Sequence, residues 1–110
     1  KDMIISAGEN VYSTEVEQVL YAHPHVLEAA VIGLPHPVWG EVVTAVVVPK
    51  PGHGINVDEL QDFCRKSLAG YKIPRKIFFV EQLPRNASGK VLKYQLRQTY
   101  KHAAQQDQSV

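Results

Sequence analysis

Cysteine is nearly absent from this 110-residue sequence, in which Cys64 is the only one. One cysteine allows neither an internal disulfide nor a zinc site built from several thiolates, and such usage is typical of a reducing compartment. Long apolar runs are also lacking. No segment approaches the ~20 residues that span a bilayer, and no segment resembles a secretory signal. We therefore expect a cytoplasmic protein without a transmembrane segment.

The five histidines are scattered, and no two of them have the i, i+4 spacing of a helical metal site. Most of them adjoin proline or glycine, which is typical of histidines in surface loops. The sequence therefore predicts no metal site.

Charge is nearly balanced over the whole chain, with 12 basic and 11 acidic residues, but it is unevenly distributed. Residues 71–101 contain a single acid, Glu81, and eight basic residues: Lys72, Arg75, Lys76, Arg85, Lys90, Lys93, Arg97 and Lys101. A patch of this kind predicts an anionic partner. Because the patch is spread over several expected elements, a small phosphate-bearing molecule fits it better than nucleic acid does.

The hydrophobic pattern predicts one small domain with both helices and strands. Strands are expected in a hairpin over 3–12 and at 26–32, 42–48 and 77–80. Helices are expected over 14–22, 56–70 and 92–100. The fold class is therefore α+β, with an N-terminal β-hairpin and a three-stranded, mainly antiparallel sheet covered on one face by helices.

Local signals refine these boundaries. Capping-box spacing predicts helix N-termini at Thr14, with Ser13 as a competing N-cap, and at Asn56. Two prolines and two glycines predict a loop over 33–41. Cys64 falls on the apolar stripe of the second helix, so we expect a small core residue rather than a reactive thiol.

Ser88-Gly89-Lys90 is the first candidate site. It is not a Walker phosphate loop, because Pro84 and Val91 stand where that motif needs glycine and serine or threonine. Lys90 is expected at the start of the third helix, where a cation opposes the helix dipole. Either its side chain simply extends into solvent, or it reaches from a flexible loop towards an external anion.

The tip of the expected hairpin is the second candidate. The small residues in Ser6-Ala7-Gly8-Glu9-Asn10 would allow a narrow ligand or another backbone to approach closely. A plain turn explains the same composition.

Four segments, in matching order and spacing, resemble the C-terminal subdomain of adenylate-forming acyl-CoA synthetases, the fatty-acid and aryl-acid CoA ligases of the AMP-binding enzyme superfamily. They are KDMIISAGENVY (1–12), GLPHPVWGE (33–41), YKIP (71–74) and LPRNASGK (83–90). The resemblance covers residues 1–100 and leaves 101–110 as a polar tail. Ala7, Ser13 and Asn86 depart from the residues usual in the family, which are glycine, proline and often threonine.

The resemblance implies a mobile lid that begins at the hinge residue Lys1 and works with an N-terminal adenylation domain absent from this sequence. The full-length enzyme would use ATP with Mg²⁺ to convert a carboxylic acid, of the fatty- or aryl-acid class, into an acyl-adenylate and pyrophosphate. The thiol of CoA would then displace AMP. The fragment alone would be inactive and would hold none of these cofactors.

The resemblance also implies roles for individual residues. Lys90 would be catalytic in adenylation, and the loop Ser6–Asn10 would replace it in a second pose and help to form the pantetheine tunnel. The expected cofactor-binding residues are Ser6, Ala7, Gly8, Glu9, Tyr71, Lys72 and Arg75. Among these, Lys72 and Arg75 would approach the CoA phosphates and Tyr71 would stack on adenine, with a solvated basic surface as the alternative.

Elementary electrostatics agrees with the role implied for Lys90. Adenylation brings a carboxylate up to a phosphate, and both are anions. An ammonium 4 Å from either one, at an effective dielectric of 20, has a Coulomb energy of about 4 kcal/mol with it. Two alternatives to a CoA ligase remain: an adenylating enzyme that loads a carrier protein, and a free-standing binding module with the same fold.

Overall fold

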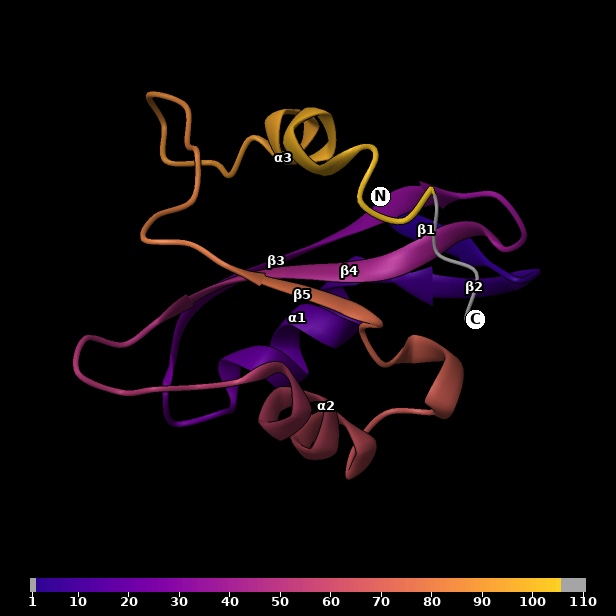
Figure 1. Cartoon of the computed structure of the whole chain (residues 1–110). Coiled ribbons are helices and arrows are strands. Elements are labelled where there is room, and N and C mark those ends of the chain that lie inside the picture. The colour runs from indigo at the N-terminus through magenta and orange to yellow at the C-terminus, as the bar shows by residue number, and fades with distance from the viewer. Residues whose placement is uncertain (1, 106–110) are drawn as a thin grey trace.

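The computed structural model describes residues 2–105, which form one five-stranded sheet with helices on both faces (Figure 1). Lys1, the expected hinge, and residues 106–110 of the expected polar tail lie outside the described residues. The strands are β1 (Met3–Ser6), β2 (Glu9–Tyr12), β3 (Val26–His36), β4 (Gly40–Pro49) and β5 (Lys76–Phe79). The helices are α1 (Ser13–Tyr21), α2 (Val57–Arg65), the 3₁₀ turn η1 (Gly70–Lys72) and α3 (Lys93–Tyr100).

Strand β4 organises the sheet, because three other strands pair with it. It pairs with β3 in a long antiparallel ladder, with β5 in a parallel one, and with β1 through the single pair Ser6–Gly40. The α+β class is thus confirmed. The sheet is larger than expected because the N-terminal hairpin joins it instead of standing beside it.

Helices cover both faces of the sheet, so the expectation of one covered face was wrong. One apolar cluster lies between the sheet and α1 and α2, and a second lies between the sheet and α3 (Figure 1). Residues 42–48 are all buried, and alternate side chains of this stretch enter the two clusters. A strand that is buried on both faces carries a nearly continuous apolar run, and residues 42–48 form such a run with Thr44 as its one polar member.

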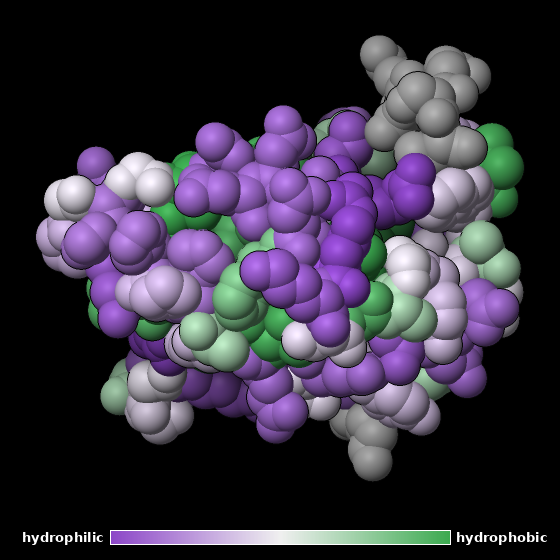
Figure 2. Space-filling model, turned by 90° about the horizontal axis from the view of Figure 1, so that it is seen from below, coloured by the Kyte–Doolittle hydropathy of each residue, from purple (hydrophilic) through white to green (hydrophobic). Residues whose placement is uncertain are grey.

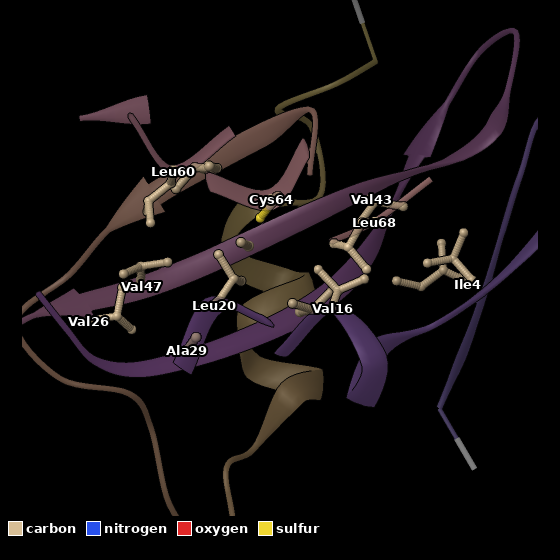
Figure 3. Packing of buried hydrophobic residues seen from close by; sticks show 14 residues of the cluster. Ile4, Val16, Leu20, Val26, Ala29, Val43, Val47, Leu60, Cys64 and Leu68 are labelled. Carbon is tan, nitrogen blue, oxygen red and sulfur yellow. The ribbon is translucent and has the colours of Figure 1, made fainter. Parts of the chain in front are cut away.

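The first apolar cluster contains Cys64, confirming it as a core residue. Figure 3 shows its side chain among Leu20, Leu60 and Val43. Burial raises the pKa of the Cys64 thiol to about 11, so the reactive thiolate is scarce at neutral pH.

The outer face on the α2 side is largely hydrophilic, with small hydrophobic areas between the polar side chains (Figure 2).

The two expected capping boxes had different outcomes. Asn56 and Glu59 form one as predicted, each side chain accepting from the other residue's backbone N–H. The Thr14 box was wrong, because α1 begins at Ser13 after Tyr12 and has no side-chain cap. Glu17, the other half of that expected box, instead accepts a hydrogen bond from the N–H of Val31 on β3.

The expected loop over 33–41 is mostly strand. The β3–β4 ladder continues to the pair His36–Gly40, leaving residues 37–39 as a short turn. Pro35 is tolerated because β3 is an edge strand, where a missing N–H breaks no ladder. Buried His36 shapes the turn, since its Nδ1 accepts from the N–H groups of Val38 and Trp39.

Two helix ends also differ from expectation. Helix α2 ends at Arg65, and Gly70 begins η1 instead of capping α2. Helix α3 begins at Lys93, so Lys90 lies in the loop before it and not at its start.

The described residues include no helix of the length and apolarity that a membrane crossing requires.

Candidate active-site surfaces

The loop that carries Lys90, which we call the lysine loop (residues 84–91), is a closed and braced structure. A bridge between Arg85 and Val91 closes it at its base. The N–H of Asn86 donates to the carbonyl of Lys90, and the N–H of Gly89 donates to the carbonyl of Asn86, both at 2.9 Å. Gly89 has a φ of +90°, a conformation that glycine adopts without strain. The loop is therefore more ordered than the sequence predicted.

The side chain of Asn86 braces the lysine loop from within. Its Oδ1 accepts from the N–H of Ser88 at 3.0 Å, from the Ser88 hydroxyl at 2.9 Å and from the N–H of Lys90 at 2.9 Å. Asparagine commonly organises turns in this way. The sequence marked Asn86 only as a departure from the family pattern and assigned it no role.

The Lys90 side chain itself is exposed. Among residues 2–105, none forms a hydrogen bond or ion pair with its ammonium. The neighbouring cation Arg85 is already engaged, with Glu28 at 2.8 Å and with the carbonyl of Gly89 at 2.6 Å. Lys90 also lines a hollow of about 760 Å³ between the lysine loop, α1 and α3. The loop thus fixes the backbone of a lysine whose charge is left available to an external anion.

The hairpin tip (Ser6–Glu9) is a two-residue turn with Ala7 and Gly8 at its centre. Their φ values are +50° and +83°, and positive φ at both central residues is the signature of a type I′ turn. Ala7 is the one described residue other than glycine with a positive φ, which explains why glycine is usual at this position in the family. Ser6 is buried, whereas the other three tip residues are exposed.

The β3–β4 turn lies directly against the hairpin tip. The N–H of Ala7 donates to the carbonyl of Trp39 at 2.9 Å. The guanidinium of Arg75 lies 4.2 Å from the centre of the Trp39 ring, in cation–π contact. The structure therefore brings Arg75 to the hairpin tip through Trp39. The sequence singled out no role for Trp39, although a lone tryptophan next to a turn glycine was a usable signal.

Tyr71 and Lys72 lie on η1 beside α1. The Lys72 ammonium pairs with Glu15 at 2.9 Å and lies 5.6 Å from the centre of the Tyr71 ring. The hydrogen bond to Glu15 raises the pKa of Lys72, so it stays charged, but this charge has an internal partner. Tyr71 is 45% exposed, which leaves its ring available for contact.

The lysine loop and the hairpin tip lie at opposite ends of the sheet. Figure 1 shows the segment between β5 and α3 projecting at one end, and the β1–β2 and β3–β4 turns at the other. The two candidate surfaces therefore face different ends of the domain. A single active site could use both only if the domain turned.

Comparison with known proteins decides the family. The model of the AMP-binding enzyme C-terminal domain matches residues 15–90, which is more than half of the chain. The chain belongs to this family. The AMP-binding C-terminal domain is 53% identical over 100 residues to a feruloyl-CoA synthase of Amycolatopsis, a match covering 91% of this chain and 20% of that protein. It is 48% identical to the long-chain-fatty-acid–CoA ligase FadD13 of Mycobacterium tuberculosis, with the same coverages.

Solved structures agree with this fold. The AMP-binding C-terminal domain superposes on apo MatB from Rhodopseudomonas palustris with a TM-score of 0.92 and 47% identity, covering 96% of this chain and 21% of that one. ATP-bound MatB gives the same TM-score and coverages with 46% identity. This chain therefore spans about a fifth of the length of its relatives.

Over residues 2–105, no three histidine, cysteine, aspartate or glutamate side chains are arranged to hold an ion. His23, His25 and His53 do lie together, with ring centres of successive pairs 5.5 and 4.3 Å apart.

Proposed function

We propose that this domain is the moving part of a ligase that activates a carboxylic acid with ATP and transfers the acyl group to CoA. The observation that carries the proposal is the exposed Lys90 ammonium, which has no partner among the described residues and stands on a backbone braced by Asn86. A fixed cation of this kind suits a reaction in which two anions must meet.

In the adenylation step, the carboxylate oxygen attacks the α-phosphorus of ATP, and the bond to pyrophosphate breaks. Lys90 would lie between the carboxylate and the α-phosphate, reduce their repulsion and stabilise the charge that develops during transfer. This role is electrostatic and involves no proton transfer to or from Lys90. Mg²⁺ would enter with ATP, and the fit of ATP and its metal depends on the large domain that relatives carry.

In the thioester step, the hairpin tip would take the place of Lys90 beside the acyl-adenylate. The CoA thiol loses its proton to solvent as its sulfur attacks the acyl carbon, and the bond from the acyl carbon to the phosphate oxygen breaks and releases AMP. Ala7 carries only a methyl group and Gly8 has no side chain, so a pantetheine arm would be able to approach the tip closely. Arg75, held on Trp39 next to the tip, would meet the phosphates of CoA.

The acid belongs, in this proposal, to the fatty- or aryl-acid class, because relatives carry the names feruloyl-CoA synthase and long-chain-fatty-acid–CoA ligase. CoA is preferred to a carrier protein as acceptor, because an arginine on an aromatic ring beside the hairpin tip suits a small phosphorylated molecule. Acyl transfer to a purified carrier protein in preference to CoA would contradict this choice.

The test is Lys90→Ala in the full-length protein, with the two steps measured separately. We expect pyrophosphate exchange to fall by at least 10²-fold, the scale of losing one electrostatic contact in a transition state. Thioester formation from preformed acyl-adenylate should stay within about twofold. Lys66→Ala, which removes an exposed lysine after α2, serves as the matched control and should change neither step. Normal exchange in the Lys90 variant would refute the proposal.

A further inference from the structure

A second lysine, Lys93, joins three separate parts of the fold. Its ammonium lies 2.6 Å from a carboxylate oxygen of Asp2, 2.7 Å from one of Glu17 and 3.3 Å from the hydroxyl of Ser13. Asp2 precedes β1, the other two oxygens belong to α1, and Lys93 is the first residue of α3. We call these four residues the lysine clamp.

The lysine clamp closes over an open edge of the sheet. Strand β3 pairs only with β4, so the N–H groups on its other side have no strand partner. One of them, from Val31, donates to the same Glu17 oxygen that Lys93 contacts. Helices α1 and α3 lie on opposite faces of the sheet, and the clamp joins them around this edge.

Asp2 is held on both its backbone and its side chain. Its carbonyl accepts from the N–H of Ser13 at 3.1 Å, and its carboxylate also contacts Arg97 at 3.3 Å. Asp2, the sequence neighbour of the expected hinge Lys1, is therefore fixed to both α1 and α3. Lys93, 91 positions further along the chain, follows Lys90 by only three residues.

The clamp and Lys90 also share one space. Asp2, Glu17, Lys93 and Lys90 all line the 760 Å³ hollow between the lysine loop, α1 and α3. The Lys93 side chain is only 19% exposed, so its ion pairs are less screened than those at the open surface. A shift of α3 against Asp2 would move the base of the lysine loop.

We propose that Lys93 is a positioning residue, whose ion pairs with Asp2 and Glu17 make the lysine loop turn as one body with the hinge end of the chain. This inference rests on the proposed function. The hairpin tip is held by different contacts, Ala7 to Trp39 and the N–H of Ile5 to Glu41 at 2.9 Å. Loss of the clamp should therefore harm the step that needs Lys90 and spare the step that needs the tip.

The experiment is Lys93→Met in the full-length ligase, since methionine keeps much of the length of the side chain and removes its charge. We expect pyrophosphate exchange to fall about 10- to 100-fold, the cost of misplacing a catalytic group by about 1 Å. Thioester formation from preformed acyl-adenylate should stay within about twofold. Lys93→Arg, which keeps the charge, should restore most of the exchange activity.

Controls separate positioning from general damage. Arg65→Gln breaks an exposed ion pair with Asp62 elsewhere on the domain and should change neither step. Should Lys93→Met fail to fold, Glu17→Gln replaces it. That variant keeps an oxygen for the Val31 N–H, weakens the pairing with Lys93, and should show the same selective loss. Equal losses in both steps, or no loss of exchange, would overturn the positioning role.

Lys90→Ala, measured alongside, distinguishes the two proposals. If that variant exchanges pyrophosphate normally, the proposed function itself fails. If it loses exchange while the clamp variants keep it, only the inference about Lys93 fails.

Discussion

The side-chain oxygen of Asn86 accepts a hydrogen bond from the backbone N–H of Lys90 at 2.9 Å, across a loop that carries the lysine at its surface. The same oxygen holds Ser88 through its N–H and its hydroxyl. One exposed amide group therefore sets the shape of the segment from which Lys90 extends. Because the Lys90 ammonium has no contact of its own among residues 2–105, its placement depends on this backbone.

Asn86→Ala should consequently lower the rate of adenylation without removing the cation. Three hydrogen bonds to Oδ1 would be lost, each contributing about 1 kcal/mol or less at an exposed site. We expect pyrophosphate exchange in the full-length protein to fall several-fold, and backbone amide exchange at Ser88 and Lys90 to accelerate. Gln82→Ala, a change of an exposed residue just before the loop, is the control. Unaltered amide exchange would show that the hydrogen bonds accepted by Asn86 do not hold the shape of the lysine loop.

Ala7 and Gly8 should respond in opposite directions to substitution. Ala7→Gly relieves a left-handed conformation, and we expect it to raise the free energy of unfolding by about 0.5–1 kcal/mol. Gly8→Ala introduces the same strain and should lower it by about 1 kcal/mol. A Cβ at Gly8 would meet no atom within 4 Å, so the cost is conformational and not steric. Urea unfolding measures both changes, and shifts of the same sign would contradict the turn assignment.

Arg75 and Lys72 should contribute unequally to CoA binding. Arg75→Ala is expected to raise the KM for CoA about fivefold, corresponding to roughly 1 kcal/mol. Lys72→Ala should have an effect below about twofold, because Glu15 already partners its ammonium. Steady-state kinetics of the full-length protein tests this order, with Lys66→Ala as a charge-matched control. A larger effect at Lys72 would show that Glu15 releases it when CoA binds.

The stability contributed by Asp2 should depend on pH. Partial burial opposes its ionisation, but hydrogen bonding and charge from Lys93, with Ser13 and Arg97, outweigh burial and lower its pKa below the ordinary 3.8. A lowered pKa in the folded state adds stability above the ordinary value, and this stability is lost as the pH falls through the lowered one. We expect the chain and its Asp2→Asn variant to differ in unfolding free energy at pH 6 and to converge below about pH 4. A difference that does not vary with pH would contradict this pairing.

Strand and helix positions were largely predictable, because periodicity and capping are local signals. Asn56 and Glu59 formed their capping box, and Cys64 took its place in the core, as the pattern around each indicated. The errors came from contacts between distant segments. Glu17 does not form its expected cap but accepts a hydrogen bond from Val31 and pairs with Lys93. Most of the segment 33–41 is strand, because β3 and β4 stay paired as far as His36 and Gly40.

The same distinction between local signals and long-range contacts applies to the candidate site residues. The sequence alone singled out Lys90, Gly8 and Arg75 as candidate site residues, because a lysine, a small loop residue and an arginine in these motifs are residue types that suit anionic and narrow ligands. Their roles stay predictions. Their neighbours were decided only by the tertiary structure: Trp39 beneath Arg75, Glu15 on Lys72, and Asp2 with Glu17 on Lys93. Such pairs join residues up to 91 positions apart, and no local pattern specifies which charges meet when the sheet and its two helical layers assemble.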